Sequence, residues 1–289
     1  MRILILGGDG MLGHQVFKHL KGRHDVRVTL RQDLASYRGF GLFSDADAYA
    51  GVDLRAIERV LEVIAEFGPE AIVNCVGIVK QRSAAEAAIP SLQINALLPH
   101  RLALLARVAG TRLVHVSTDC VFSGRSGRYR ESDTPDAEDL YGRTKYLGEV
   151  AEARCITLRT SIIGFELSRK TGLLEWFLSQ RGGTVKGFGR ALFSGLTTPE
   201  MARVIEKLLV DHPHASGLYH VSAEPISKHD LLVKLNAALG LGITVVRDEE
   251  FHCDRSLDST RFRSEFGYRP PSWDDMVSEL AHTVSMDGR

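Results

Sequence analysis

The chain has 289 residues, of which 44% are hydrophobic, and its 36 lysines and arginines balance its 36 aspartates and glutamates. A hydrophobic fraction of this size can fill the core of one large domain or of a domain with a substantial lobe, which excludes a disordered chain. The zero net charge indicates neither nucleic-acid binding nor electrostatic attachment to a membrane, so local cations must bind any anionic ligand.

Cysteine usage and the N-terminal segment predict a reduced, soluble, cytoplasmic protein. The four cysteines lie far apart without a C-x-x-C pair, which argues against a zinc site and against a disulfide framework; no metal is expected. Met1 and Arg2 lead directly into an apolar run too short for a signal peptide, and no apolar span of ~20 residues follows. The oligomeric state is not revealed, and a homodimer stays open.

The start of the chain follows the pattern of a dinucleotide-binding turn. Residues 2–6 (RILIL) are a continuous apolar run typical of a strand buried on both faces, and a helical pattern comes after them. Between the two lies the spacing G-x-x-G-x-x-G, so backbone amides at the helix N-terminus would face a pyrophosphate. We therefore predict these cofactor contacts: Gly7, Gly10, Met11, Leu12 and Gly13.

The second predicted strand, residues 25–30, ends at Arg31, where an NAD site usually offers a carboxylate to the ribose 2′-hydroxyl. An arginine here favours a 2′-phosphate, so NADP(H) is the preferred cofactor. Asp33 lies close by and could reverse the preference to NAD(H), and a solvated loop arginine is the other interpretation of Arg31. Asp53 precedes the next helical pattern, where it either caps the helix or contacts the adenine; capping is the simpler expectation.

The next strand completes a doubly wound α/β pattern. Residues 71–77 (AIVNCVG) are a buried strand running into a loop, so strands and helices alternate along the first half of the chain. Asn95 lies in the following apolar helix, and its amide needs a partner, either near the cofactor or purely structural. Ligands bind at the carboxyl ends of such strands, which adds these cofactor candidates: Asn74, Cys75, Val76, Gly77 and Asn95.

Two later segments predict acid–base chemistry. A strand at residues 113–119 delivers two hydroxyls and a carboxylate at its end, those of Ser117, Thr118 and Asp119. Residues 141–145 (YGRTK) place Tyr141 and Lys145 four positions apart, on one face of a helix. A nearby cation lowers a phenol pKa from about 10, which would make Tyr141 a general acid/base tuned by Lys145. Taken alone, this spacing also fits an ordinary amphipathic helix.

Five motifs carry a closer resemblance: the glycine triplet, residues 74–77 (NCVG), residues 94–96 (INA) followed by Pro99, residues 117–124 (STDCVFSG) and residues 141–145 (YGRTK). In this order they resemble the extended short-chain dehydrogenase/reductase family, and within it the dTDP-4-dehydrorhamnose reductase group. The resemblance implies a Rossmann fold and NAD(P)H-dependent reduction of a 4-keto-6-deoxy nucleotide sugar in bacterial O-antigen or capsule precursor synthesis.

The same resemblance implies a role for each catalytic residue. Thr118 would orient the keto oxygen, Tyr141 would protonate it, and Lys145 would bind the nicotinamide ribose while lowering the pKa of Tyr141. The family often has an aromatic residue after S-T-D and a tryptophan soon after L-R-T-S, where this chain has Cys120 and Ile162. The substrate pocket is therefore lined differently, which implies a different deoxysugar. An epimerase or dehydratase of this fold and a non-catalytic regulatory subunit are the alternatives.

The second half of the chain is expected to add a smaller, discontinuous substrate lobe. Residues 164–196 leave the core, and the glycines among them make this stretch loop-rich. A helix from Pro199 and a strand at residues 218–221 then return to the sheet. We therefore assign residues 1–163 and 197–223 to the Rossmann domain, and residues 164–196 and 224–289 to the lobe.

A nucleotide sugar carries a diphosphate, so the neutral chain must supply local cations to bind it. Arg255 matches the R-x-x-L-D pattern of the family, although each candidate cation could equally be a solvated surface charge. The predicted substrate contacts are Thr118, Asp119, Cys120, Ile162, Lys186, Arg190 and Arg255.

Overall fold

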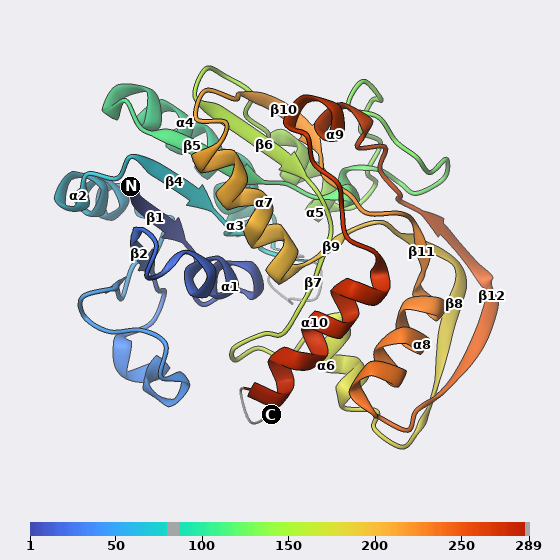
Figure 1. Cartoon of the computed structure of the whole chain (residues 1–289). Coiled ribbons are helices and arrows are strands. Elements are labelled where there is room, and N and C mark those ends of the chain that lie inside the picture. Colours follow the sequence, from blue (N-terminus) through green and yellow to red (C-terminus); the bar gives the residue numbers. More distant parts are fainter. Residues whose placement is uncertain (80–86, 287–289) are drawn as a thin grey trace.

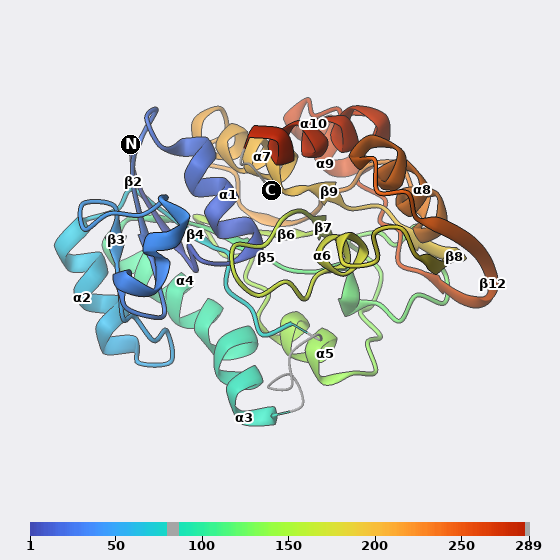
Figure 2. The ribbon, with the colours of Figure 1, turned by 90° about the horizontal axis from the view of Figure 1, so that it is seen from below.

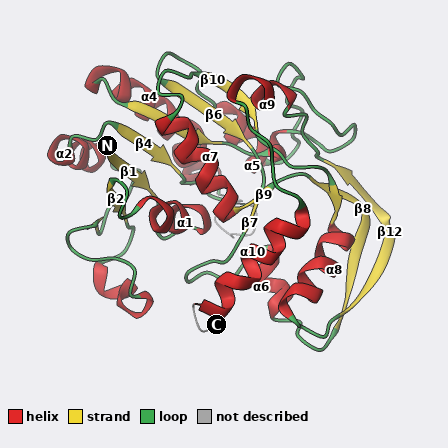
Figure 3. Cartoon of the chain, viewed as in Figure 1, coloured by secondary structure: helices red, strands yellow, loops and turns green. Residues whose placement is uncertain are grey.

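The computed structural model describes residues 1–79 and 87–286, built around one parallel sheet (Figures 1 and 3). Its strands are β1 (Arg2–Leu6), β2 (Asp25–Thr29), β3 (Ala48–Tyr49), β4 (Ala71–Asn74), β5 (Arg112–Val116), β6 (Cys155–Arg159) and β10 (Gly217–His220). They are hydrogen-bonded in the order β10-β6-β5-β4-β1-β2-β3, and every neighbouring pair is parallel. This is the order of a doubly wound sheet with one strand added, which confirms the predicted fold class.

Helices cover both faces of this sheet, which is why its central strands β1 and β4 are mainly apolar. Helices α1 (Met11–Leu20) and α7 (Thr198–Val210) lie on one face, and α2 (Ile57–Phe67) and α4 (Leu98–Ala109) lie on the other (Figure 2). Successive side chains of β1 point to opposite faces. Ile3 and Ile5 accordingly join the apolar cluster under α1 and α7, whereas Leu4 and Leu6 join the cluster under α2 and α4.

A second sheet of three strands lies beside the first. Its order is β11 (Ile226–Ser227), β8 (Thr184–Phe193) and β12 (Thr244–Asp254), and helix α8 (Lys228–Leu239) packs against β8. The short strands β7 (Ile162–Ile163) and β9 (Leu196–Thr197) pair where the chain leaves and re-enters the main sheet. The remaining helices are α3 (Ala88–Ser91), α5 (Leu140–Leu147), α6 (Leu173–Leu178), α9 (Thr260–Phe266) and α10 (Trp273–Met286). The residue boundaries of the two domains stay a prediction.

Strand β8 corrects the expectation of a loop-rich segment. Its residues alternate between buried and more exposed positions along the strand. A Cβ added at Gly187 would lie 2.9 Å from the Cα of His229, so this glycine allows α8 to approach the strand instead of turning the chain. The segment of residues 34–51, which has no clear periodicity, contains a 3-10 helix (Leu34–Phe40) and the edge strand β3.

Candidate active site

Helix α5 carries the predicted acid–base pair to the carboxyl end of β5. The helix begins where the Asp139 side chain accepts a hydrogen bond from Gly142 N at 2.9 Å, a standard N-terminal cap. Tyr141 is half-buried and Lys145 is 3% exposed. Lys145 Nζ donates to the carbonyl of Val116 at 2.8 Å, which fixes the lysine beside the last residue of β5.

The Thr118 hydroxyl faces the same place. Its Oγ1 accepts from Cys120 N at 3.1 Å and donates to Asp119 Oδ1 at 3.2 Å. It also lies close enough to the Tyr141 phenol to act on its pKa. Ser117 instead donates its hydroxyl to Glu149 Oε1 at 2.8 Å. The structure therefore brings Thr118, and not Ser117, together with Tyr141.

The charges around the pair correct one expectation about pKa values. Burial raises the pKa of Tyr141, the Cys120 thiol and Asp119 raise it further, and the hydroxyl of Thr118 opposes the rise. The net effect is a raised phenol pKa, so burial outweighs the lowering that was expected here. The tuning of Tyr141 by Lys145 stays a prediction. Burial also lowers the pKa of Lys145 to about 8, against the opposing charge of Glu149.

Asn95 joins the loop after β4 to helix α5. It is fully buried in a π-helical segment (Leu92–Leu97) that precedes α4. Its Oδ1 accepts from Ile78 N at 2.8 Å, and its Nδ2 donates to Ile78 O at 3.0 Å and to Thr144 Oγ1 at 3.2 Å. These bonds give the amide the structural partners that a buried amide needs. Its predicted contact with the cofactor stays a prediction.

Two glycines set how closely α5 approaches its neighbours. A Cβ added at Gly142 would lie 2.2 Å from the carbonyl oxygen of Cys120, and one added at Gly148, just after the helix, would lie 1.9 Å from that of Asn95. Such distances are far below van der Waals contact, so any side chain there would move the helix. The position of α5, and with it that of Tyr141, thus requires glycine at the two places where the helix region approaches the carbonyls of Cys120 and Asn95.

A buried ionic network beneath the site was missed by the sequence analysis. Glu149 accepts from Arg159 Nε at 2.8 Å and from its Nη2 at 2.7 Å, and the two side chains are 7% and 3% exposed. Arg159 Nη1 lies 3.2 Å from His220 Nε2, and burial lowers the pKa of that histidine to about 4. No local pattern indicates this network, because Glu149 lies just after the end of α5 and Arg159 is the last residue of β6.

The glycine-rich turn has the form expected of a pyrophosphate site. Gly7 has a φ of 81°, which favours glycine, and Gly10 is the N-cap of α1 without a side-chain cap. A Cβ added at Gly13 would lie 2.0 Å from Gly7 O, so α1 rests directly on the turn. The first amides of α1, at Met11 and Leu12, therefore lie at a helix N-terminus without a side-chain acceptor, where anions bind.

The end of β4 forms the neighbouring wall. Asn74 is fully buried; its Oδ1 accepts from Val76 N at 3.1 Å, and its Nδ2 lies 3.1 Å from His115 Nδ1. The side chain of Val76 lies against Gly7, which joins this wall to the glycine turn. Cys75 lies near Lys145, and burial raises the pKa of its thiol to about 12. Gly77 faces the Asn95 amide.

The polar cofactor candidates Arg31, Asp33 and Asp53, which follow β2 in the chain, differ in exposure and in their hydrogen-bond partners. Arg31 is exposed, and Asp33 accepts from the backbone and the hydroxyl of Ser36 at 3.0 and 2.6 Å as the N-cap of the 3-10 helix. Asp53 does not cap α2, which begins after Ala56, so that expectation is wrong. Its carboxylate binds the Arg55 guanidinium instead, which lowers the pKa of Asp53 to about 2.

The predicted substrate contacts separate into two groups. Arg255 donates to the carbonyls of Phe122 and Ser123 at 2.8 and 3.3 Å, and its charge acts on Asp119, whose pKa burial raises. A cavity of about 320 Å³ is lined here by Ser123, Glu138, Asp139 and Arg255. Lys186, paired with Asp248 at 3.0 Å, and Arg190 lie on exposed positions of β8, whereas Ile162 is half-buried in β7.

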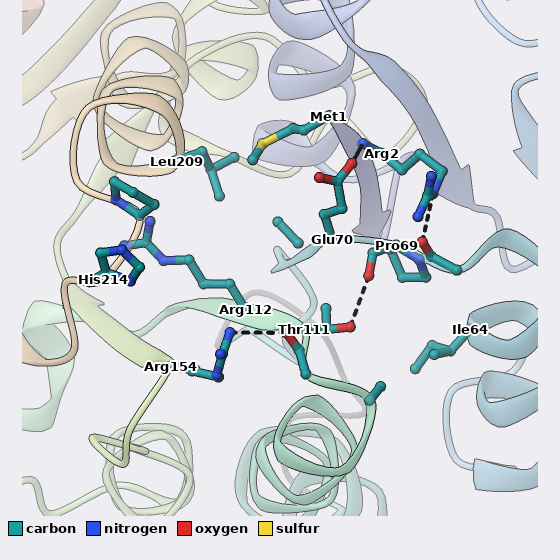
Figure 4. Close-up of a pocket in the computed structure, with 15 residues that line it drawn as sticks. Met1, Arg2, Ile64, Pro69, Glu70, Thr111, Arg112, Arg154, Leu209 and His214 are labelled. Carbon is teal, nitrogen blue, oxygen red and sulfur yellow. Dashed lines mark hydrogen bonds between the residues drawn. The ribbon is translucent and has the colours of Figure 1, made fainter.

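A cavity of about 550 Å³ at the amino ends of β1, β4 and β5 is a poorer candidate (Figure 4). The three arginines that line it bond to carbonyls at helix ends: Arg2 to Gly68, Arg154 to Gly110, and Arg112 to Leu208. Such bonds satisfy the free carbonyls at the C-termini of α2, α4 and α7, whose partial charge disfavours anions. This end of the sheet also faces away from the strand ends that carry Thr118.

Residues 1–79 and 87–286 contain neither a membrane-spanning helix nor a metal-binding cluster. None of the helices there combines the length and the apolar character that a membrane crossing requires. Nor do three or more histidine, cysteine, aspartate or glutamate side chains gather there as a metal site would require.

Comparison with known proteins identifies the family. A model of the RmlD substrate binding domain matches residues 1–286. The chain belongs to this family. A dTDP-4-dehydrorhamnose reductase of Aggregatibacter actinomycetemcomitans is 26% identical over 96% of this chain and 98% of its own length. Methionine adenosyltransferase 2 subunit beta of Bos taurus is 31% identical over 52% of this chain and 42% of its own length.

Among solved structures, a dTDP-4-dehydrorhamnose reductase of Bacillus anthracis in complex with NADP shares the fold of the chain. Its TM-score is 0.78 at 22% identity, over 98% of this chain and 99% of that one. The family match confirms the resemblance to the dTDP-4-dehydrorhamnose reductase group that the five motifs indicated.

Proposed function

We propose that the chain is an NADPH-dependent reductase that converts the 4-keto group of a 6-deoxy nucleotide sugar into a hydroxyl. The observation that carries this proposal is the convergence of Thr118, Tyr141 and Lys145 at the carboxyl end of β5. A surface-polysaccharide precursor is the corresponding product class, and a reductase named for glycan biosynthesis in Haloferax volcanii is 25% identical over 99% of this chain. The four free thiols suit a reducing, cytoplasmic compartment.

The chemistry assigned to the three residues is a simple reduction of a carbonyl. The bound nicotinamide supplies a hydride to the keto carbon. The Thr118 hydroxyl holds the keto oxygen by a hydrogen bond, and the Tyr141 phenol gives that oxygen its proton, which completes the alcohol. A raised phenol pKa suits this direction, because Tyr141 stays protonated until the oxygen becomes basic. Lys145 binds the nicotinamide ribose and keeps a cation near the phenolate that remains.

The residues present fit NADPH. A pyrophosphate contact is supported by the N-terminus of α1, which has no side-chain cap, and by the close approach of Gly13 to the backbone of Gly7. Arg31 is exposed just after β2, whereas Oδ1 of Asp33 accepts two hydrogen bonds from Ser36. The exposed cation supports NADPH over NADH, because an arginine can bind the 2′-phosphate.

The sugar nucleotide is assigned to the side of the site that Arg255 lines. The guanidinium supplies a local cation for a diphosphate beside Asp119. Cys120 and Ile162 stand where the family often has aromatic residues, so we propose that smaller side chains line the pocket there and that it takes a different deoxysugar from rhamnose. Lys186 and Arg190 stay proposed contacts, although Lys186 already binds Asp248.

The test is the oxidation of NADPH, followed by absorbance, across a panel of 4-keto-6-deoxy nucleotide sugars. Tyr141→Phe is expected to abolish turnover while NADPH affinity stays within about threefold, because the phenol acts in proton transfer. Turnover that survives in this variant would refute the role of Tyr141. Interconversion of sugars without net NADPH consumption would instead indicate an epimerase or dehydratase. A partner enzyme activated in fixed proportion without turnover would indicate a regulatory subunit.

We also infer a homodimer that buries an apolar strip on α4 and α5. Leu104 and Val108 of α4 are 50% and 80% exposed and lie four residues apart on one helical face, and Leu97, which ends the π-helical segment before α4, is 43% exposed. Tyr146 and Leu147 of α5 are 44% and 56% exposed. Exposed apolar side chains of this kind favour association. Light scattering should give a dimer mass that Leu104→Glu reduces to a monomer mass.

A further inference from the structure

The glycine turn contains a carboxylate at a place where the proposed cofactor brings negative charge. Asp9 stands between Gly7 and Gly10, and its side chain is 10% exposed. A carboxylate beside a diphosphate repels it, and the repulsion is stronger where bulk water is excluded. A dinucleotide therefore binds this turn well only if another group neutralises Asp9.

A segment far away in the sequence supplies that group. Arg169 Nη2 lies 2.8 Å from Asp9 Oδ2, and the Tyr37 hydroxyl donates to the same oxygen at 3.3 Å. Arg169 belongs to residues 164–172, which we name the strap. The strap connects β7 to α6 and passes beside α1 in both views (Figures 1 and 2). The lobe thus reaches across to the turn that is expected to hold the cofactor.

The strap is packed in a way that holds Arg169 at this place. Phe165 and Leu167 are 7% and 6% exposed, which anchors one end. Glu166 Oε2 accepts from the backbone N–H groups of Thr171 and Gly172 at 2.6 and 2.7 Å, which closes the segment into a tight loop. A Cβ added at Gly172 would lie 2.8 Å from Met11 Cε, so the other end of the strap rests against the start of α1.

We propose that Arg169 is a diphosphate-binding residue of the cofactor site. It cancels the charge of Asp9 and shares its guanidinium between that carboxylate and the diphosphate at the N-terminus of α1. One N–H of the guanidinium binds Asp9, and 33% of the side chain is exposed, so a planar fork with further donors faces outward. The assignment rests on the proposed function, because it presupposes a bound dinucleotide.

The experiment measures dissociation constants for NADPH and NADH by nucleotide fluorescence, without any turnover. Arg169→Met is expected to weaken both by roughly 10- to 100-fold, because it leaves Asp9 unpaired beside the diphosphate. Asp9→Asn should keep affinity within about threefold, and Asp9→Asn/Arg169→Met should regain at least about tenfold over Arg169→Met. Arg169→Lys, which keeps the charge, should retain most of the affinity and guards against a folding defect in the methionine variant.

Lys170→Met is the matched control, because it removes the same charge from the neighbouring position of the strap and should leave both constants unchanged. Unchanged binding by Arg169→Met would overturn the proposal. A loss confined to NADPH would also overturn it, since that would assign Arg169 to the 2′-phosphate. A double variant as weak as Arg169→Met would refute the neutralisation of Asp9. Wild-type protein that binds neither nucleotide would instead contradict the proposed function itself.

Discussion

Replacing Glu149 by glutamine is expected to destabilise the protein by about 3–5 kcal/mol, because it leaves the charge of Arg159 buried and unpaired. The carboxylate accepts two N–H groups of Arg159, at 2.8 and 2.7 Å, and the hydroxyl of Ser117 at 2.8 Å. The amide of glutamine keeps one acceptor oxygen but turns an NH₂ group toward the guanidinium. Exposures of 7% and 3% leave almost no room for water to replace the lost bond.

Urea unfolding of the wild type and the variant measures this loss, and the chain offers a matched control. Arg203 binds Glu279 through two bonds of 2.7 Å each, but these side chains are 41% and 37% exposed. Glu279→Gln should therefore cost only about 1 kcal/mol or less. Equal losses for the two variants would refute the reasoning, because geometry rather than burial would then set the cost. Adding Arg159→Met to Glu149→Gln should recover part of the loss.

Two further predictions concern the turn and the lysine. Gly13→Ala should cost about 1–3 kcal/mol of stability and weaken NADPH binding, because the added Cβ would lie 2.0 Å from Gly7 O. Gly39 has open space around it, so Gly39→Ala should change neither the stability nor the affinity. Urea unfolding and fluorescence titration measure both variants. The pKa of Lys145 is about 8 in the folded protein and is lower than in the unfolded chain. Between about pH 8 and pH 10 the unfolded chain therefore binds more protons than the folded chain, so the free energy of unfolding of the wild type should rise with pH relative to that of Lys145→Met. Parallel curves of unfolding free energy against pH for the two proteins would contradict this.

The parts of the site that the sequence predicts are those encoded within a few neighbouring residues. The glycine triplet between an apolar strand and a helical pattern predicts where α1 begins. A hydroxyl-rich end of an apolar strand predicts that Thr118 lies at the edge of the sheet. The four-residue spacing of Tyr141 and Lys145 predicts a shared helical face. Each of these statements follows from the local period of a helix or a strand.

The features that the sequence analysis missed depend on contacts between distant segments. Arg169 reaches Asp9 across 160 positions of the chain, and no local pattern pairs them. A glycine in the sequence can either turn the chain or allow a helix to approach closely, so the glycines of β8 do not distinguish a strand from a loop-rich segment. The direction of the Tyr141 pKa shift depends chiefly on burial, and burial exists only in the folded chain.

The close approach of helix α5 to the backbone of Cys120 affects how substrate preference can diverge in this family. Gly142 rests on the carbonyl of Cys120 and not on its side chain. The backbone at position 120 therefore positions α5 and its Tyr141, while the side chain at the same position is a proposed contact of the sugar. A substitution there can reshape the space for the sugar without displacing Tyr141. New specificity can thus arise by single steps that leave the reaction geometry intact.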